Sequence, residues 1–502
     1  MFIRKKKNAS GKISVQVIDK SSGKYKVVQT IGSSADTKKI EAYEHEAKAW
    51  IKKRAGRIEL DFSNEVRLAE QLLDGIQSFT LVGLDLLLGR IFDRIGFNQI
   101  PDPIFRYLVI YRLAYPRSKL KTTEYLSRYH QIDWNEDQLY RYMDKLHSQQ
   151  KDLVQSISYK HTLKVLGGKL SVVFYDVTTL YFEIDQEDDL RKTGFSKEGK
   201  HQNPQIVLGL LVSENGYPLA YDIFEGNKFE GHTMLPMVDA FKQKYKLKHL
   251  IIVADSGLLS QSNIDQLLAN KDEFILGARI KNEPQAIQGK ILGLSLENGQ
   301  YAVIEKQSLK LIITYSKDRA RKDLHNREKG LKRLEKQVRS GKLTKSHINK
   351  RGYNKYLKLK GELQVVIDRE RCKEDARWDG LKGYLTNARL DYDSVLANYQ
   401  HLWQIEKAFR ISKSDLKIRP IFHRLQRRIE AHICLTFVSY KIYKELERLL
   451  KEKQTQLSPE KAIEIAKSIF RITLQTPSSK TTVQKTLINT EEQVLLAKTF
   501  NF

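Results

Sequence analysis

Hydrophobic and polar residues repeat along this chain with two different periods, and the change from one to the other marks its segments. Residues 12–32, KISVQVIDKSSGKYKVVQTIG, alternate residue by residue on either side of SSG, which predicts a β-hairpin. A charged helical segment follows over residues 35–57, and the helical period continues over residues 65–158. The pattern therefore predicts a small β unit followed by a helical region.

The next segment, residues 169–280, changes to apolar runs of strand length. It predicts three successive strands, a helix over residues 233–245, a strand over 249–257, a helix over 261–270 and a closing strand in EFILGARI. Three strands followed by alternating helix and strand is the order of elements in an RNase H-like core. We therefore expect an α/β fold built on an RNase H-like catalytic core.

A basic segment interrupts this core before it resumes. Residues 281–375 begin with strand character and end in a stretch rich in lysine and arginine. GLKGYLTN, residues 380–387, predicts a returning strand, and helices are expected over Ser394–Ser414 and Phe422–Leu450. The chain is thus expected to divide into an N-terminal β-hairpin and helix region (1–60), a helical region (61–160), the first part of the core (161–280), a basic inserted subdomain (281–375), the second part of the core (376–450) and a helical, polar C-terminal region (451–502).

Charge is the strongest signal in the composition. Lysine and arginine total 87 of the 502 residues against 60 aspartates and glutamates, a formal net charge of +27. A protein with such an excess of positive charge attracts polyanions, and nucleic acid is the commonest large polyanion in a cell. The helical region 61–160 and the basic insertion are the segments that we expect to face DNA. A plain helical bundle and a solvated helical surface explain these two segments as well.

Other global features narrow the class of protein. No apolar run approaches the roughly 18–20 residues of a membrane span, and the basic N-terminus lacks the apolar segment of a signal peptide. We therefore expect a cytoplasmic protein with no membrane association. Because the chain has only two cysteines, Cys372 and Cys434, we expect neither a disulfide framework nor a cysteine-rich zinc site.

Two aspartates stand in strands where a carboxylate is unusual. Asp176 interrupts the otherwise apolar and aromatic run VVFYDVTTLYFE, and an unpaired carboxylate in a protein interior is costly. A bound divalent cation is one way to compensate that charge. Asp255 follows the apolar run LIIVA at the carboxyl end of a strand, where functional groups of α/β sheets usually lie. Taken alone, an aspartate after a strand is most often a turn or helix-cap residue, which is the alternative for Asp255.

A third acid, Glu406, lies on the helix predicted over YQHLWQIEKAFRISK. At 3.6 residues per turn, one face of this helix carries Tyr399, Leu402, Trp403, Glu406, Arg410 and Lys413. A face that combines apolar residues with one acid and two bases suits a half-buried helix that presents Glu406 to a metal. The alternative is an amphipathic helix with an incidental acid at its boundary.

Three segments together resemble DDE transposases of bacterial insertion sequences: VVFYDVTTLYFE, IIVADSG and YQHLWQIEKAFRISKSDLKIRPIFHRLQRRIEAHI. They are most similar to the subgroup with a Tyr-Arg-Glu-Lys signature and an insertion in the RNase H-like core. Tyr399, Glu406 and Lys413 match the spacing of that signature, whereas Leu402 replaces its arginine. The resemblance covers residues 169–280 and 378–440, and RYLVIYRLAYPRSKL is a weaker likeness to the helical region of the same enzymes.

The resemblance implies a metal-dependent enzyme that cuts and joins DNA. Asp176, Asp255 and Glu406 would be the catalytic residues and would hold two Mg²⁺ or Mn²⁺ ions, which prefer such oxygen ligands. The implied partners are double-stranded DNA, as inverted-repeat ends and as target, and a second copy of the chain in a homodimer on DNA. The implied location is the bacterial cytoplasm, in association with the nucleoid.

Further residues are predicted to contact DNA. By resemblance, Tyr399 and Lys413 would contact phosphates near the transposon end. Arg410 could stand in for the arginine that Leu402 replaces. His423, Arg424 and Arg428 lie on the adjoining basic face, where they are either DNA contacts or part of a solvated helix.

Two other functions fit the same sequence. The first is an RNase H-like nuclease that cleaves DNA without joining it. The second is a DNA-binding descendant of a transposase whose metal site is dead. The complete set of three acids argues against the second alternative, and Leu402 argues slightly for it.

Overall fold

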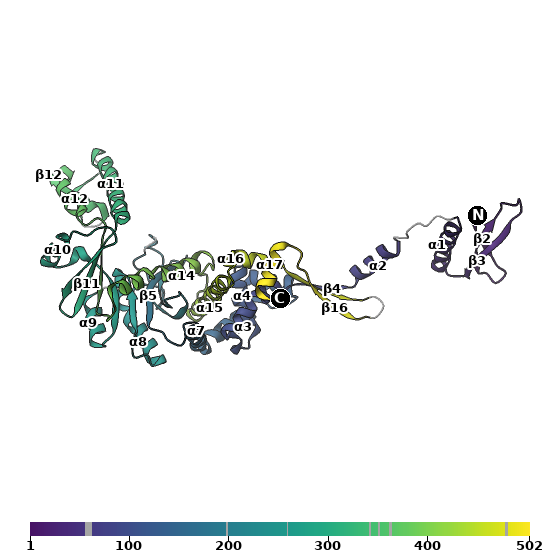
Figure 1. The fold of residues 1–502 in the computed structure, drawn as a ribbon, viewed down its shortest axis with the longest axis horizontal. Helices are drawn as coiled ribbons and strands as arrows, with labels where there is room; N and C mark the ends of the chain where they lie inside the picture. The colour runs from purple at the N-terminus through teal and green to yellow at the C-terminus, as the bar shows by residue number, and fades with distance from the viewer. Residues whose placement is uncertain are drawn as a thin grey trace. The chain divides into compact units, whose positions relative to one another are not determined.

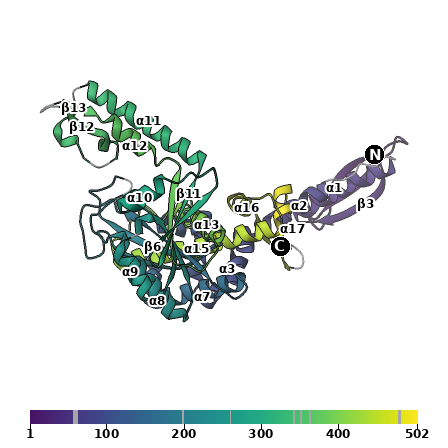
Figure 2. The same ribbon diagram turned by 60° about the vertical axis from the view of Figure 1, so that its left-hand side comes forward.

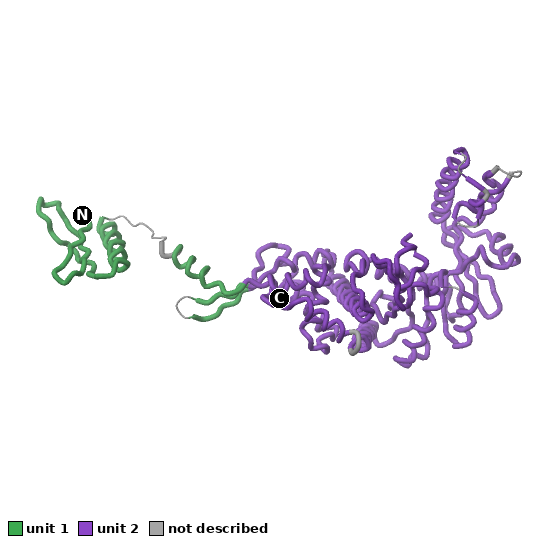
Figure 3. Tube along the Cα trace, turned by 180° about the vertical axis from the view of Figure 1, so that it is seen from behind, with its two compact units in different colours: residues 1–78, 472–485 green, residues 79–471, 486–502 purple. Residues whose placement is uncertain are grey.

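The structure is a computed structural model, and the chain in it forms two compact units. The first comprises residues 1–78 and 472–485, and the second comprises residues 79–471 and 486–502 (Figure 3). The structure describes residues 1–55, 63–196, 199–258, 260–340, 343–349, 352–360, 364–476 and 480–502. Within these ranges, no helix has the length and apolar character needed to cross a membrane.

A small antiparallel sheet with one helix packed on it begins the first unit. Its strands are β1 (Phe2–Lys7), β2 (Ile13–Asp19) and β3 (Lys26–Ser34), and its helix is α1 (Thr37–Arg54). The predicted hairpin is confirmed as β2 and β3. The sequence pattern did not predict β1, because its FIRKKK sequence is almost wholly polar and gains its order from pairing with β2. Helix α2 (Ser63–Asp74) follows.

A second three-stranded sheet in the described chain has the order β16-β15-β4. Its strands are β4 (Ile76–Leu81), β15 (Phe470–Gln475) and β16 (Thr482–Thr486). The prediction of helix throughout residues 65–158 is therefore wrong over β4. The reason is that β4 pairs with a strand almost 400 positions later in the chain, and such a partner leaves no mark on the local period.

The remainder of residues 65–158 confirms the helical prediction. Its helices are α3 (Arg90–Ile95), α4 (Pro103–Ala114), α5 (Lys119–His130), α6 (Glu136–Gln149) and α7 (Lys151–Val165), with short helical turns at Asp85–Gly89 before α3 and at Phe97–Gln99 after it. Side-chain caps begin three of them, because Asp102, Ser118 and Asn135 each accept a hydrogen bond from a backbone N–H of the first turn. These helices surround the long helix α15 (Gln426–Glu452), which contacts α3, α4, α6 and α7.

The main sheet of the second unit, in its described residues, has eight strands in the order β10-β11-β14-β9-β8-β5-β6-β7. Its core strands are β5 (Val172–Tyr181), β6 (Gln205–Ser213), β7 (Pro218–Glu225), β8 (Ile251–Ala254) and β9 (Glu273–Ala278). Strands β5, β6 and β7 are antiparallel neighbours, whereas β8 and β9 continue parallel to β5. This order confirms the predicted RNase H-like core.

Helices cover both faces of this sheet (Figures 1 and 2). The crossover helices α8 (Met234–Tyr245) and α9 (Gln261–Ala269) pack on one face, against the inward side of Val173 and Tyr175. Helices α14 (Trp403–Ser414) and α15 pack on the other face, against Phe174 and Leu180. The elements that complete the unit are α10 (Gln285–Leu292), α13 (Tyr392–Gln400), α16 (Pro459–Ala466) and α17 (Glu491–Phe500).

The basic segment 281–375 contributes to the fold in two ways. Its strands β10 (Tyr301–Lys306) and β11 (Leu309–Tyr315) extend the main sheet beside β14 (Leu381–Thr386), the confirmed returning strand. Its remaining elements have a small core of their own, which contains Leu334, Tyr356 and Val365. These elements are α11 (Lys317–Arg339), β12 (Leu357–Lys360), β13 (Gln364–Ile367) and α12 (Arg369–Ala376).

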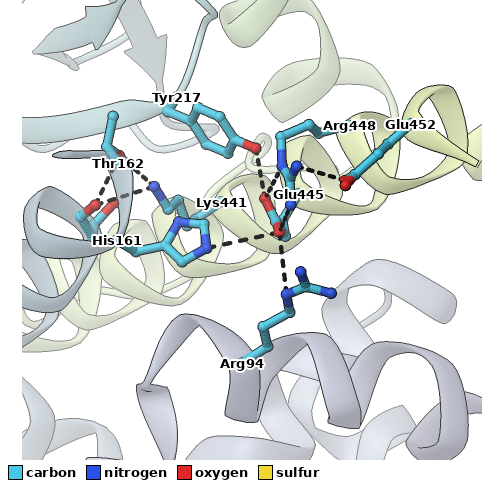
Figure 4. Close-up of polar contacts among 9 residues, drawn as sticks. Arg94, His161, Thr162, Tyr217, Lys441, Glu445, Arg448 and Glu452 are labelled. Carbon is cyan, nitrogen blue, oxygen red and sulfur yellow. Dashed lines mark hydrogen bonds and ion pairs between the residues drawn. The ribbon is translucent and has the colours of Figure 1, made fainter. Parts of the chain in front are cut away.

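A buried ionic network fastens α15 to the sheet and to α7 (Figure 4). The Glu445 carboxylate is fully buried and accepts hydrogen bonds from Tyr217 Oη at 2.6 Å and Arg448 Nη2 at 2.7 Å. His161 Nε2, on α7, lies 3.7 Å from the same carboxylate. One turn earlier, the buried Lys441 ammonium donates to the Ser158 carbonyl oxygen at 3.1 Å. Burial opposes ionisation of Glu445, but the contacts with His161, Arg448 and Tyr217 outweigh it and hold the pKa of Glu445 well below its usual value.

We predict that Glu445→Gln lowers the free energy of unfolding by about 3 kcal/mol, because it leaves Arg448 and His161 without their buried carboxylate. Since the pKa of Glu445 is lower in the folded protein than in the unfolded chain (about 4.3), its contribution is present above that pH. It is lost as the pH falls through the folded value. The variant should therefore lose stability less steeply than wild type on acidification, as measured by thermal unfolding.

The matched control is Glu452→Gln, which removes a mostly exposed partner of the same Arg448. It should change the free energy of unfolding by less than about 1 kcal/mol. Equal effects of the two substitutions would show that the buried network does not fasten α15.

Candidate active site

The strand register places two of the three predicted acids side by side. Strands β5 and β8 are parallel, and their last paired residues are Tyr175 and Ala254. Asp176 and Asp255 are the next residue on each strand, and neighbouring strands lie about 4.8 Å apart. Phe174 and Val253, two positions earlier, both face the core under α14 and α15. By the alternation of strand side chains, the two aspartates belong to that same face.

Their surroundings show why this edge of the sheet tolerates them. Asp176 is half-buried between buried neighbours, and its Oδ1 accepts a hydrogen bond of 2.8 Å from the Val177 backbone N–H. Asp255 lies beyond the last residue of β8 and is exposed. The two carboxylates therefore stand where the sheet opens to solvent.

Tyr399, at the end of α13, is buried against Asp255. Its hydroxyl donates a hydrogen bond of 3.1 Å to Asp255 Oδ1, and only 5% of the residue is exposed. Gly277 on β9 makes this approach possible, because a Cβ atom there would lie 2.5 Å from the Tyr399 hydroxyl. Burial and then the charge of Asp255 raise the pKa of Tyr399, so the hydroxyl keeps its proton and remains a donor.

Glu406 lies in the first turn of α14, where the helix dipole favours a negative charge. It is exposed, on a helix that packs on β5 and β6. Lys382 on β14 connects it with Asp255. Burial lowers the pKa of Lys382, and Arg319 lowers it further, while Asp255 and Glu406 oppose that shift. The two acids therefore act on the same ammonium group.

The helix that was predicted over Ser394–Ser414 is in fact two helices. α13 ends at Gln400 and α14 begins at Trp403, with a turn between them. The prediction that Tyr399 and Trp403 share a face is wrong, because Tyr399 is buried whereas Trp403 is 49% exposed. The break lets Tyr399 and Leu402, which is 7% exposed, both enter the core.

The residues predicted to contact DNA have different surroundings. Arg410 and Arg424 are exposed, and Lys413 is half-buried on α14. Arg428 forms a two-pronged ion pair with Asp144, at 2.9 and 3.1 Å, and its guanidinium lies over the Tyr140 ring. His423 is half-buried, with its ring beside those of Tyr140 and His432. Their contacts with DNA stay predictions.

A basic cavity of about 450 Å³ opens beside Ser256, the residue after Asp255. Its three acidic side chains each pair with a lysine or arginine of the same wall. The basic side chains that line it are Arg279, Lys281, Arg319, Arg327, Lys355 and Lys382. Lys382 was not among the predicted site residues, although a lysine within the strand LKGYLT is as unusual as an aspartate within VVFYDV.

The donor set suits a hard divalent cation. Asp176, Asp255 and Glu406 offer carboxylate oxygens alone, which Mg²⁺ and Mn²⁺ prefer. In the described part of the chain, no three or more histidine, cysteine, aspartate or glutamate side chains lie close enough together to hold a metal ion. The residue types thus fit a divalent cation, but the three carboxylates do not form a closed metal-binding cluster in this structure.

An RNase H-like sheet with acids at adjoining strand ends, and a third acid on a covering helix, defines the class of RNase H-like enzymes that act on nucleic acid. The family model described as "Transposase DDE domain" matches residues 167–442, more than half of the chain. The chain therefore belongs to this family and is a DDE-type DNA transposase. Enzymes of this family generally use divalent metal ions.

Two further comparisons were made with known proteins. A solved structure of the piggyBac transposase synaptic complex with hairpin DNA matches 77% of this chain and 79% of its own, with 10% identity and a TM-score of 0.37. No curated protein matches the chain.

We predict that Gly277→Ala lowers the free energy of unfolding by about 1–3 kcal/mol, because the new methyl group overlaps the Tyr399 hydroxyl and the Ser256 backbone. Urea unfolding measures the effect. Gly289→Ala is the control, since a Cβ atom at that helical position meets nothing within 4 Å. Alanine there should leave stability unchanged or raise it. A Gly277→Ala variant as stable as wild type would contradict the close approach of Tyr399 to β9.

Proposed function

We propose that this transposase binds the inverted-repeat ends of a mobile element, cleaves them and joins the freed 3′-hydroxyls to target DNA. The observation that carries the proposal is the adjoining position of Asp176 and Asp255 in the β5–β8 register, under the helix that bears Glu406. Cleavage and joining can use the same site, because only the nucleophile differs: water attacks in cleavage and a DNA 3′-hydroxyl attacks in joining.

In this proposal, Asp176, Asp255 and Glu406 hold two Mg²⁺ or Mn²⁺ ions. When bound, such ions activate the attacking hydroxyl and stabilise the leaving oxygen. The chain contributes the placement of the carboxylates. The strand register fixes the two aspartates, and the first turn of α14 presents Glu406.

The DNA backbone would follow the basic surface beside these carboxylates. Arg410 lies four residues after Glu406 and Lys413 three residues after Arg410, so both lie on the Glu406 face of α14 and can contact phosphates. Arg424 and His423 follow in the next segment, whereas Arg428 would contact DNA while still paired with Asp144. The basic cavity beside Ser256 offers further cations to a phosphate. A homodimer on paired ends, in the bacterial nucleoid, completes the proposal.

Tyr399 has a different role in this proposal from the phosphate contact that the sequence predicts. Its hydroxyl is buried and donates to Asp255, so we assign it the positioning of that carboxylate. A donor on Oδ1 restricts rotation of the side chain and leaves the remaining lone pairs for a cation.

We predict that Asp176→Asn, Asp255→Asn and Glu406→Gln each reduce Mn²⁺-dependent cleavage of labelled end DNA by at least about a hundredfold, because each removes a charged oxygen ligand. DNA binding should persist. The control is Asp185→Asn, an exposed acid on the loop after β5, which should cleave like wild type. Cleavage that survives any of the three substitutions would overturn the assignment. Products that are cut but never joined to target DNA would identify a nuclease instead.

We predict that Tyr399→Phe weakens Mn²⁺ binding about tenfold, as expected for one lost hydrogen bond to a charged group. Calorimetric titration with Mn²⁺ measures this directly. Affinity for end DNA and its salt dependence should remain those of wild type. Tyr392→Phe, on the same helix, is the control. Reduced DNA affinity with unchanged Mn²⁺ binding would instead assign Tyr399 to a phosphate.

A further inference from the structure

A buried group of cationic side chains lies apart from the three carboxylates. This buried cationic cluster consists of Arg112, His432 and His423, whose side chains lie side by side in that order, and of Lys119, whose ammonium lowers the pKa of both histidines. Arg112 comes from α4, Lys119 is the first residue of α5, and His432 lies on α15. His423 belongs to the segment between α14 and α15. Four separate parts of the second unit therefore bring positive or titratable groups to one place.

Three members of the cluster are more than nine-tenths buried. The exposed fractions are 7% for Arg112, 8% for Lys119 and 6% for His432. Arg112 Nη2 lies 2.8 Å from both ring nitrogens of His432. His432 Nε2 lies 3.0 Å from the Ile418 carbonyl oxygen, and the ring centroids of His432 and His423 are 5.3 Å apart.

No negative charge balances the cluster within the described chain. None of its four members forms an ion pair with a carboxylate, and Arg112 Nε is buried without a hydrogen-bond partner. Asp144, on the neighbouring helix α6, is already bound by Arg427 and Arg428. A buried guanidinium that lacks a counter-charge is unfavourable by several kcal/mol, so an anion from outside the chain would stabilise the cluster.

The pKa values of the four groups are lowered, as expected for buried bases without a negative charge nearby. Burial, and then Lys119, Arg112 and Arg428, lower the pKa of His423 to about 3. Burial and then Arg112 lower the pKa of Lys119 well below its usual value. The charged groups that act on His423 and Lys119 are therefore all cations. Arg112 keeps its charge at neutral pH, since its pKa is lowered only to about 10.

We propose that the buried cationic cluster binds a phosphate group of the DNA backbone. The assignment rests on the proposed function, because it takes DNA as the source of the phosphate. A phosphate accepts several hydrogen bonds and could satisfy Arg112 Nε and the Lys119 ammonium together. The N-terminus of α5, a helix of 12 residues, adds backbone N–H groups and the positive end of a helix dipole.

The surface around the cluster suits a polyanion more than a free ion. Arg117 and Ser118, which precede Lys119, are exposed, and so is Arg424, which follows His423. Phe422 is 77% exposed beside them, and such a ring can stack on a base or pack on a sugar. A DNA strand that places one phosphate on the cluster would meet further cations on either side.

Lys119→Met tests the proposal. Methionine keeps the unbranched apolar stem in its buried place and removes the amino group that would donate to the phosphate. Binding of wild type and variant to a labelled duplex with the terminal sequence of the element is measured at several salt concentrations. We expect weaker binding, with a salt-dependence slope lower by about one unit, as for one lost phosphate contact. Lys121→Met, on the same helix and paired with the exposed Glu124, is the control and should keep the wild-type slope.

The outcomes separate the possible sources of the anion. A Lys119→Met slope equal to that of wild type would overturn the proposal. So would thermal stabilisation of wild type by inorganic phosphate that Lys119→Met loses while DNA binding stays unchanged, since the site would then take a free anion. Glu406-dependent cleavage by wild type tests the proposed function separately.

If Lys119→Met does not fold, wild type with ¹³C-labelled histidines provides the second measurement. Addition of the duplex should shift the imidazole resonances of His423 and His432, with His423→Gln used to assign them. The resonance of His249, which lies outside the cluster before β8, should stay unchanged. No shift at His423 and His432 under saturating duplex would overturn the proposal.

Discussion

The parallel pairing of β5 with β8 places Asp176 and Asp255 at adjoining positions, and the other site residues take their places from that register. A slip of one residue would turn one aspartate toward α8 and α9, where Tyr175 and Ala254 are buried. Long apolar runs on both faces make such a slip costly, because every side chain of the strand would change sides. The same register sets the position of β9, whose Gly277 admits Tyr399 to Asp255.

Helix α15 carries two buried polar clusters, and only one of them contains a carboxylate that balances its positive charges. Around Glu445, each charge has a partner, because the carboxylate accepts from Tyr217 and Arg448 and its burial is thereby compensated. Around His432, four turns toward the N-terminus, the neighbours are Arg112 and Lys119, and no carboxylate is among them. This contrast is the reason why we propose an external anion for the cluster around His432.

The features predictable from the sequence are those that a local pattern encodes. The core strands have continuous apolar runs, and Asp176 stood out because it interrupts one of them. Strand β4 was missed because its partner β15 is distant in sequence, and the break at residues 401 and 402 was missed because the helical period continues through it. The burial of Arg112 and Lys119 was likewise not predictable from the sequence pattern. On an amphipathic helix a basic residue is expected to face solvent, and only packing against other elements of the fold encloses these two.

Leu402 shows how a departure from a signature can follow from packing. At 7% exposure it forms part of the core under the sheet, so an arginine in its place would bury a charge beside the apolar neighbours of Ile405. The turn that buries Leu402 also carries Tyr399 to Asp255 and separates it from the exposed face of α14. Tyr399 and Leu402 thus both face inward, while Arg410 and Lys413 remain on the helix that bears Glu406. In the proposed function, Tyr399 and Leu402 therefore do not contact the DNA backbone. Arg410, Lys413 and cations from other elements of the fold contact it instead.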